Sequence, residues 1–112
     1  MATTLKQLVA PQYLTATPDV FYTTSTGVVT LLRRLTFHNS DVDTQTVSIW
    51  IVPSSGTADD SNLILDAKAV GADQTYTFPD IESHVMKSGD TFVVQASAAT
   101  SIMMILSGTE IS

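Results

Sequence analysis

Oxygen-bearing side chains recur at every second position in the stretch NSDVDT, which contains Asn39, Asp41 and Asp43. The calcium loop of an EF-hand begins in this way, because calcium takes carboxylate and carbonyl oxygens as ligands. The pattern then fails, since such a loop needs glycine at its sixth position and glutamate at its twelfth, where this chain has Thr44 and Trp50. We therefore predict no metal site and no cofactor, although a cation held by oxygens from several loops stays open.

Residues that could act in catalysis are few, and none has a partner in a recognisable motif. His38 ends a predicted strand and His84 lies in a predicted connection. No serine lies in a G-x-S-x-G nucleophile motif, and no Gly-rich loop leads into a helix. The neighbours Asp59 and Asp60 point apart in an extended chain, whereas catalysis by paired carboxylates needs two acids that face each other. We predict no catalytic residues and no enzyme activity.

The charge of the chain limits its partners. Most acidic residues fall in predicted turns, where aspartate hydrogen-bonds its own backbone. The formal net charge is −6, so the surface repels phosphate backbones and we expect no nucleic-acid partner. The longest apolar run, Ile102 to Leu106, is too short to span a membrane, so we expect no membrane partner. The chain has no cysteine and begins without a signal-peptide pattern, which fits synthesis in a reducing compartment.

The elements that carry these residues are predicted to be strands. The chain contains 17 Thr, 11 Val and 7 Ile, and β-branched residues suit pleated strands. No segment has helical apolar spacing over three turns. Strands are predicted over residues 19–24, 28–38, 46–52, 63–70, 74–78, 91–96 and 101–111. This spacing favours a single all-β domain over residues 19–112, a β-sandwich or jelly roll of about seven or eight short antiparallel strands. Before it we predict an extended N-terminal arm over residues 1–18, with short edge strands as an open alternative within it.

The only tryptophan lies on an unexpected face. In the predicted strand 46–52, Val47, Ile49 and Ile51 alternate with Thr46, Ser48 and Trp50, so the tryptophan shares the polar side. Either the strand is central and covered on both faces, or a loop folds over Trp50, or Trp50 anchors a protein interface.

A charged residue lies on what the alternation predicts to be the core face. Arg33 shares the parity of four apolar residues, namely Val29, Leu31, Leu35 and Phe37. An unpaired guanidinium in the core would be very costly. We predict a β-bulge at Arg33 and Arg34 that shifts the register; the alternative is that the side chain reaches the rim and pairs with an acid.

The stretch IMMIL, residues 102–106, is apolar on both faces. One face can lie in the core, and the other needs cover from the arm, from another subunit or from another protein. Methionine adapts well to such contacts. The predicted interface residues, which include apolar residues of the arm, are Trp50, Arg33, Arg34, Met103, Met104, Leu5, Leu8 and Tyr13.

The sequence from Tyr22 to Ser112 resembles small virion proteins of tailed bacteriophages. In these, a strand with arginine leads into an HN turn, a strand like VSIWIVPSSG follows, and after a GD turn the closing strand ends in SGTEI. The resemblance implies a capsid decoration or cement protein that binds the major capsid protein and stabilises the shell. It also implies synthesis in the host cytoplasm, a place on the capsid surface of the virion, and a homo-oligomer. The alternative is a tail- or fibre-associated module that contacts a host receptor.

Overall fold

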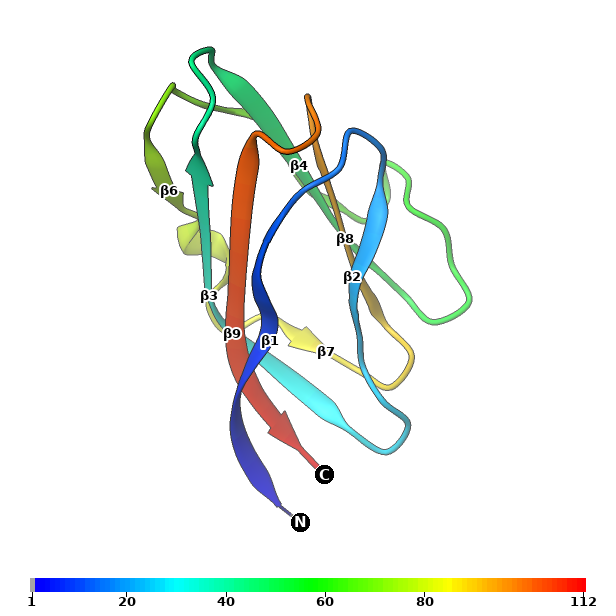
Figure 1. Cartoon of the computed structure of the whole chain (residues 1–112). Coiled ribbons are helices and arrows are strands. Elements are labelled where there is room, and N and C mark those ends of the chain that lie inside the picture. Colours follow the sequence, from blue (N-terminus) through cyan, green and yellow to red (C-terminus); the bar gives the residue numbers. More distant parts are fainter. Residues whose placement is uncertain (1) are drawn as a thin grey trace.

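The computed structural model describes residues 2–112, which form two antiparallel sheets packed face to face (Figure 1). Sheet A has the order β1-β9-β3-β6, with β7 also paired to β3, and sheet B has the order β2-β8-β4-β5. The predicted all-β sandwich is confirmed. The elements are β1 (Thr3–Tyr13), β2 (Asp19–Thr23), β3 (Val29–Asn39), β4 (Gln45–Val52), β5 (Leu63–Val70), β6 (Thr75–Thr77), the 3-10 turn η1 (Pro79–Ile81), β7 (Val85–Met86), β8 (Thr91–Ala96) and β9 (Ile102–Ile111).

The strand pairing is nested along the chain. β1 pairs with β9, β2 with β8, β3 with β6 and β7, and β4 with β5. The links β9–β3 and β8–β4 then join these pairs into the two sheets. Such a long hairpin, folded over on itself, is the jelly-roll topology.

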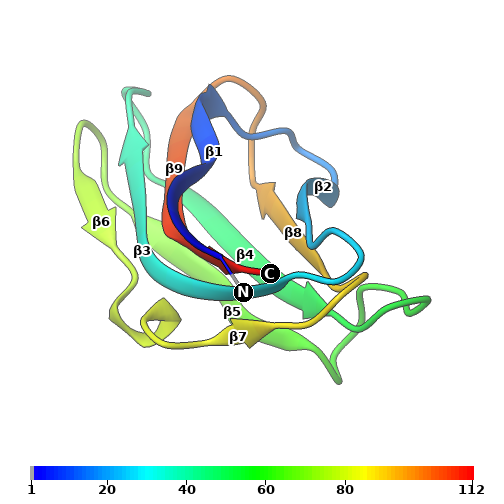
Figure 2. The same ribbon diagram turned by 90° about the horizontal axis from the view of Figure 1, so that it is seen from below.

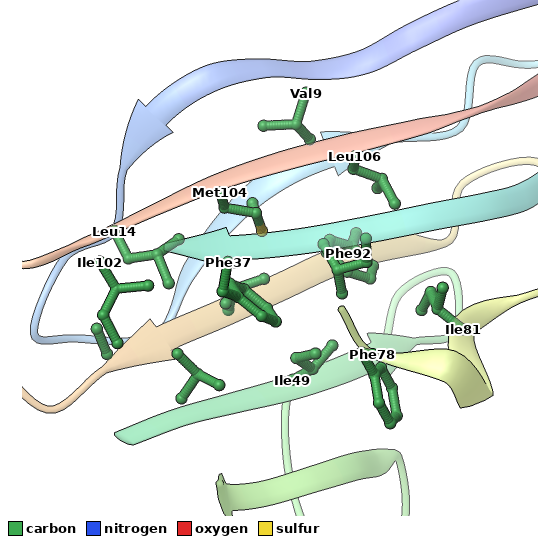
Figure 3. Close-up of a cluster of buried hydrophobic side chains, with 14 of the residues drawn as sticks. Val9, Leu14, Phe37, Ile49, Phe78, Ile81, Phe92, Ile102, Met104 and Leu106 are labelled. Atoms are coloured by element: carbon green, nitrogen blue, oxygen red, sulfur yellow. The ribbon is translucent and has the colours of Figure 1, made fainter. Parts of the chain in front are cut away.

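The core lies between the two sheets and is built by alternation along the strands. Phe37 and Met104 point inward from sheet A toward Ile49 and Phe92 of sheet B, and all four are 0% exposed (Figure 3). Each side chain of this size contributes about 2 kcal/mol when it leaves water, so these few pairs hold the layers together.

The predicted N-terminal arm is wrong. Residues 3–13 form β1, which pairs with β9 from Thr3 opposite Ile111 to Tyr13 opposite Met103. Val9 is 2% exposed and belongs to the core. β3 occupies one edge of β9, and the other edge offers unpaired backbone groups that β1 satisfies. The sandwich therefore begins at β1 rather than at residue 19.

The predicted bulge in β3 is confirmed. Leu32 lies opposite Gly108 and Arg34 opposite Ser107, which leaves Arg33 without a partner in β9. The extra residue exchanges the two faces of the strand and bends it. Figure 2 shows this bend in β3, with β6 beside its C-terminal part and β7 beside its N-terminal part.

The bulge also corrects the predicted core face. Leu35 and Phe37, which follow the bulge, are 0% exposed and lie in the core as expected. Before the bulge, Thr30 and Leu32 are 0% exposed, so the alternate residues Val29 and Leu31 point away from the core. Their assignment to the core was wrong because the faces are exchanged at Arg33.

A hydrogen bond between side chains links the two sheets near the chain termini. The Tyr22 hydroxyl, on sheet B, donates to Glu110 Oε2 on sheet A at 2.5 Å and lies 2.7 Å from Thr30 Oγ1. Lys6 donates to the other carboxylate oxygen of Glu110 at 3.2 Å. The hydrogen bond from Tyr22 lowers the pKa of Glu110, while burial, followed by the contact with Glu110, raises the pKa of Tyr22.

We expect Tyr22→Phe to lower the free energy of unfolding by about 1.5 kcal/mol at neutral pH, because a hydrogen bond to a charged group is lost. The lowered pKa of Glu110 adds stability that is present above its ordinary value of 4.5 and is lost as the pH falls through the folded pKa. The raised pKa of Tyr22 adds stability that is present below 10.0 and is lost as the pH rises further. Urea unfolding at several pH values checks both. As the pH leaves the range between 4.5 and 10.0, the free energy of unfolding should fall less in the variant than in the parent. An equal fall in both proteins would contradict the linkage.

Candidate interaction surface

The outer face of sheet A carries apolar side chains that nothing in residues 2–112 covers completely. Leu5, Thr109, Leu31 and Val85 lie opposite one another in register and form one row across four strands. Leu5 is 81% exposed and Val85 is 52% exposed. The next row joins Ile111 to Val29. We call the residues Leu5, Val29, Leu31, Val85 and Ile111 the apolar patch.

A shallow hollow of about 440 Å³ adjoins the apolar patch. Its lining residues come from β1, β9 and β3 and are Leu5, Lys6, Gln7, Arg33, Ser107 and Gly108. Position 108 has no room for a side chain, because a Cβ there would lie 2.5 Å from the carbonyl oxygen of Leu31 and 2.8 Å from Leu8 Cδ1. The hollow thus combines an apolar wall at Leu5 with a guanidinium at Arg33.

Positive charge is concentrated around this hollow. The whole chain has five Lys and Arg residues, of which Lys6 and Arg33 line the hollow and Arg34 lies opposite its floor residue Ser107. Lys6 forms an ion pair with Glu110 at 3.2 Å. Within residues 2–112, neither arginine forms an ion pair or a side-chain hydrogen bond, and both are exposed. Both arginines also line a neighbouring hollow that contains Glu82, with no ion pair formed, so the two guanidinium groups are available to an external acid.

The predicted interface residues separate into three groups in the structure, which lie on the outer face of sheet A, in the interior and on the outer face of sheet B. Leu5 and Arg33 line the hollow, and Arg34, opposite Ser107, lines a neighbouring hollow together with Arg33. Tyr13 and Met103 lie opposite each other at the other end of the same face, where Tyr13 is 49% exposed. The structure therefore gathers five of the eight predicted residues on the outer face of sheet A.

Two predicted interface residues belong to the interior. Met104 is 0% exposed because it takes the inward position in β9, so its assignment to an interface is wrong. Leu8 is the extra residue at an irregularity of β1 between Gln7 and Val9, and it packs against the core. The apolar run IMMIL is therefore half core, and only Met103 and Ile105 face outward.

Trp50 lies on the outer face of sheet B, as its parity predicts. In register with it are Val93 of β8 and Leu63 of β5, and Val93 is only 5% exposed. Val52, also on this face, is 3% exposed, and the 53–62 loop approaches it at Gly56. Trp50 is half-buried, so this second apolar row is partly covered by the chain itself.

Sequence reasoning missed several of these surface residues. Val29 and Leu31 were placed in the core because the exchange of faces that the bulge causes was not applied to the residues before Arg33. Val85 lies in a two-residue strand that no pattern could reveal. Ile111 could have been found by extending the alternation of IMMIL to the end of β9.

Side chains that could bind a metal or act in catalysis do not come together in the part of the chain that the structure describes. Residues 2–112 contain no group of three or more His, Asp or Glu side chains placed to hold a metal ion. His38 Nε2 lies 3.6 Å from Asp73 Oδ1 in an exposed pair, which is worth little in water. Within the same residues, no helix has the length and hydropathy to cross a membrane.

The aromatic residues do not form a common platform. Tyr13 lies beside Ser40, and Tyr22 lies between the sheets at Glu110. Tyr76 lies under the Lys68 ammonium, 5.1 Å from its ring centre, and Trp50 lies on the opposite sheet. A rim of clustered aromatic rings, which would favour glycan binding by a tail module, is not formed by these four residues.

Neither models of protein families nor curated proteins match the sequence. The resemblance to virion proteins therefore stays a proposal, which the surfaces described above must support.

We expect deletion of Arg33 to leave the protein folded, at a cost of about 1–2 kcal/mol, because Leu32 and Arg34 then continue a regular ladder opposite Gly108 and Ser107. Deletion of Thr36 is the matched control. It would exchange the faces of the following residues and should abolish folding. Circular dichroism and thermal melting compare the two, and equal damage from both deletions would contradict the bulge assignment.

We expect Trp50→Ala to lower the free energy of unfolding by about 2 kcal/mol, because the cover of Val93 is lost with part of the indole. Trp50→Phe should restore most of this stability. An unchanged melting temperature in Trp50→Ala would show that Trp50 serves only an external contact.

Proposed function

We propose that this protein is a structural virion protein of the capsid decoration or cement type, which binds the major capsid protein through the outer face of sheet A. The observation that carries the proposal is the apolar patch, on a face that residues 2–112 leave open. Exposed apolar surface of this kind marks sites of protein association. The role needs binding alone and no catalysis, metal or cofactor.

The topology supports this role by analogy. Jelly rolls are common in viral capsid proteins, and they also occur in lectins and cupins. Fold alone does not assign function, so the argument depends on the surface. The resemblance of residues 22–112 to phage virion proteins points in the same direction.

The sheet edges support association through faces rather than through added strands. β1 carries Lys6, Pro11 and two irregularities of register. β5 contains Ala67 at a positive φ of 48°, and β2, β6 and β7 are five, three and two residues long. Natural sheets use charges, proline, bulges and short strands to prevent edge pairing. The open surfaces are therefore the outer faces.

A sandwich with apolar surface on both outer faces can bridge two partners. The apolar patch lies on sheet A, and the row around Trp50 lies on sheet B, on the opposite side of the core. Once one face is bound, the second contact becomes effectively intramolecular. Binding only to the assembled shell then stabilises the shell by mass action, by about 2.7 kcal/mol per site at 100-fold excess over Kd.

The experiment strips the protein from particles of the phage that encodes it, adds it back, and measures the bound amount and the temperature of DNA release. We expect Val85→Asp to weaken rebinding at least tenfold, about 1.4 kcal/mol, because a carboxylate would enter an apolar contact. Val85 is 52% exposed, so the fold should not change.

Val20→Asp tests the second face, because Val20 is 57% exposed and lies opposite Val93 in the row around Trp50. Ala72→Asp, at an exposed position in the turn between β5 and β6, is the matched control and should rebind as the parent does. Loss of rebinding in Val20→Asp, with Val85→Asp unaffected, would move the contact to the face of Trp50. Stripped and restored particles that release DNA at the same temperature would contradict the decoration role. A few copies at one vertex, rather than many over the shell, would favour the tail module.

A further inference from the structure

The turn between β3 and β4 presents an apolar side chain in an acidic setting. Val42 is 87% exposed, more than any other large hydrophobic residue of the described chain. It lies between Asp41 and Asp43 in this turn, and the turn lies at the end of the molecule opposite the two termini (Figure 1). We call residues 39–44 the finger.

The finger is held in one shape by a buried side chain. The Asn39 amide group, in a residue that is 0% exposed, donates to the carbonyl oxygens of Asp43 and Val70, each at 2.9 Å. Its Oδ1 accepts from the backbone N–H of Asp41 at 2.9 Å. This network fixes the turn before any partner arrives, so binding through Val42 costs little ordering entropy.

The two carboxylates of the finger differ in availability. Asp41 Oδ1 accepts from the backbone N–H of Val42, and Asp41 Oδ2 accepts from the Gln45 side chain at 3.1 Å. The Asp43 side chain is exposed and has no hydrogen bond or ion pair within residues 2–112. The finger therefore offers one apolar side chain and one free carboxylate on adjacent residues.

The hollow on sheet A offers the complementary pair. Its Leu5 side chain is 81% exposed and adjoins Arg33, whose guanidinium has no acid partner in the described chain. A chain with 11 acidic and five basic residues has its unpaired arginines concentrated at this one place. Charge and apolar surface thus match between the finger and the hollow.

We propose that the finger of one copy docks in the hollow of a second copy, with Val42 against Leu5 and Asp43 against Arg33 and Arg34. The finger cannot reach the hollow of its own chain. Arg34 and Asn39 are five residues apart on β3, roughly 17 Å along a paired strand, and the turn that follows extends beyond the end of β3 (Figure 1). Two different surfaces meet, so the contact is heterologous and generates a closed ring or an open chain of copies.

This contact goes beyond the proposed function, because it concerns copies of this chain and needs no shell. It is also compatible with that function, since Val29, Val85 and Ile111 stay free for the capsid. Linked copies would bind the shell with higher avidity than single copies.

The experiment measures self-association of the purified full-length chain by sedimentation velocity from 10 µM to about 1 mM, at low and at high salt. We expect concentration-dependent association that weakens with salt, because exposed ion pairs are screened. Asp43→Arg alone and Arg33→Asp with Arg34→Asp should each weaken association at least tenfold, since like charges then face each other.

The decisive variant combines Asp43→Arg with Arg33→Asp and Arg34→Asp in one chain, which restores opposite charges across the contact. Association should return toward that of the parent. The matched control is Asp60→Arg with Lys68→Asp and Lys87→Asp, which changes the same numbers of charges elsewhere and should leave association unchanged. Circular dichroism checks that every variant is folded.

A parent that stays monomeric at 1 mM, or a combined variant that associates no better than the single reversals, would overturn the proposal. A loss of association in the control variant as large as in the single reversals would overturn the proposal too, because net charge rather than this contact would then control association. The decoration role is tested separately, since rebinding of Val85→Asp to particles does not depend on these outcomes.

Discussion

A single unpaired residue in β3 determines the outer surface of sheet A. β9 alternates without interruption between Ile102 and Leu106, and β3 must match it on both sides of Arg33. The extra residue lets Leu32 and Leu35 both enter the core although their spacing in the sequence is odd. The same irregularity turns Val29 and Leu31 outward. The apolar patch and the exposed arginines are thus two consequences of one backbone feature.

The alternation of apolar and polar residues was sufficient to predict most strands, but it failed where the alternation is broken. β4 and β8 follow regular patterns and were predicted within a residue or two, and β5 was predicted at its bounds although its register with β4 shifts twice. β1 was read as an arm because its irregularities at Leu8 and around Pro11 destroy the period of two, although an edge strand tolerates proline. The two residues of β7 are too few to make a pattern.

The candidate site shows the same limit. Leu5 and Arg33 were named from the sequence for separate reasons, and only the register of β1, β9 and β3 brings them to one hollow. Trp50 was placed on the correct face, yet its packing over Val93 depends on cross-strand partners that sequence parity does not identify. Val42 was taken as part of an acidic turn, because exposure of a single valine depends on how Asn39 folds the backbone around it.

Electrostatics explains why the few cations matter in a chain of net charge −6. Two copies of such a chain repel one another, and salt screens that repulsion beyond about 10 Å at 0.1 M ionic strength. Close contacts are therefore governed by the charges that face each other rather than by the net charge. Arginines held out by a bulge, against an acidic finger held rigid by Asn39, would make neighbouring copies attract at the one place where they meet. An acidic surface elsewhere then disfavours contacts between copies through other faces.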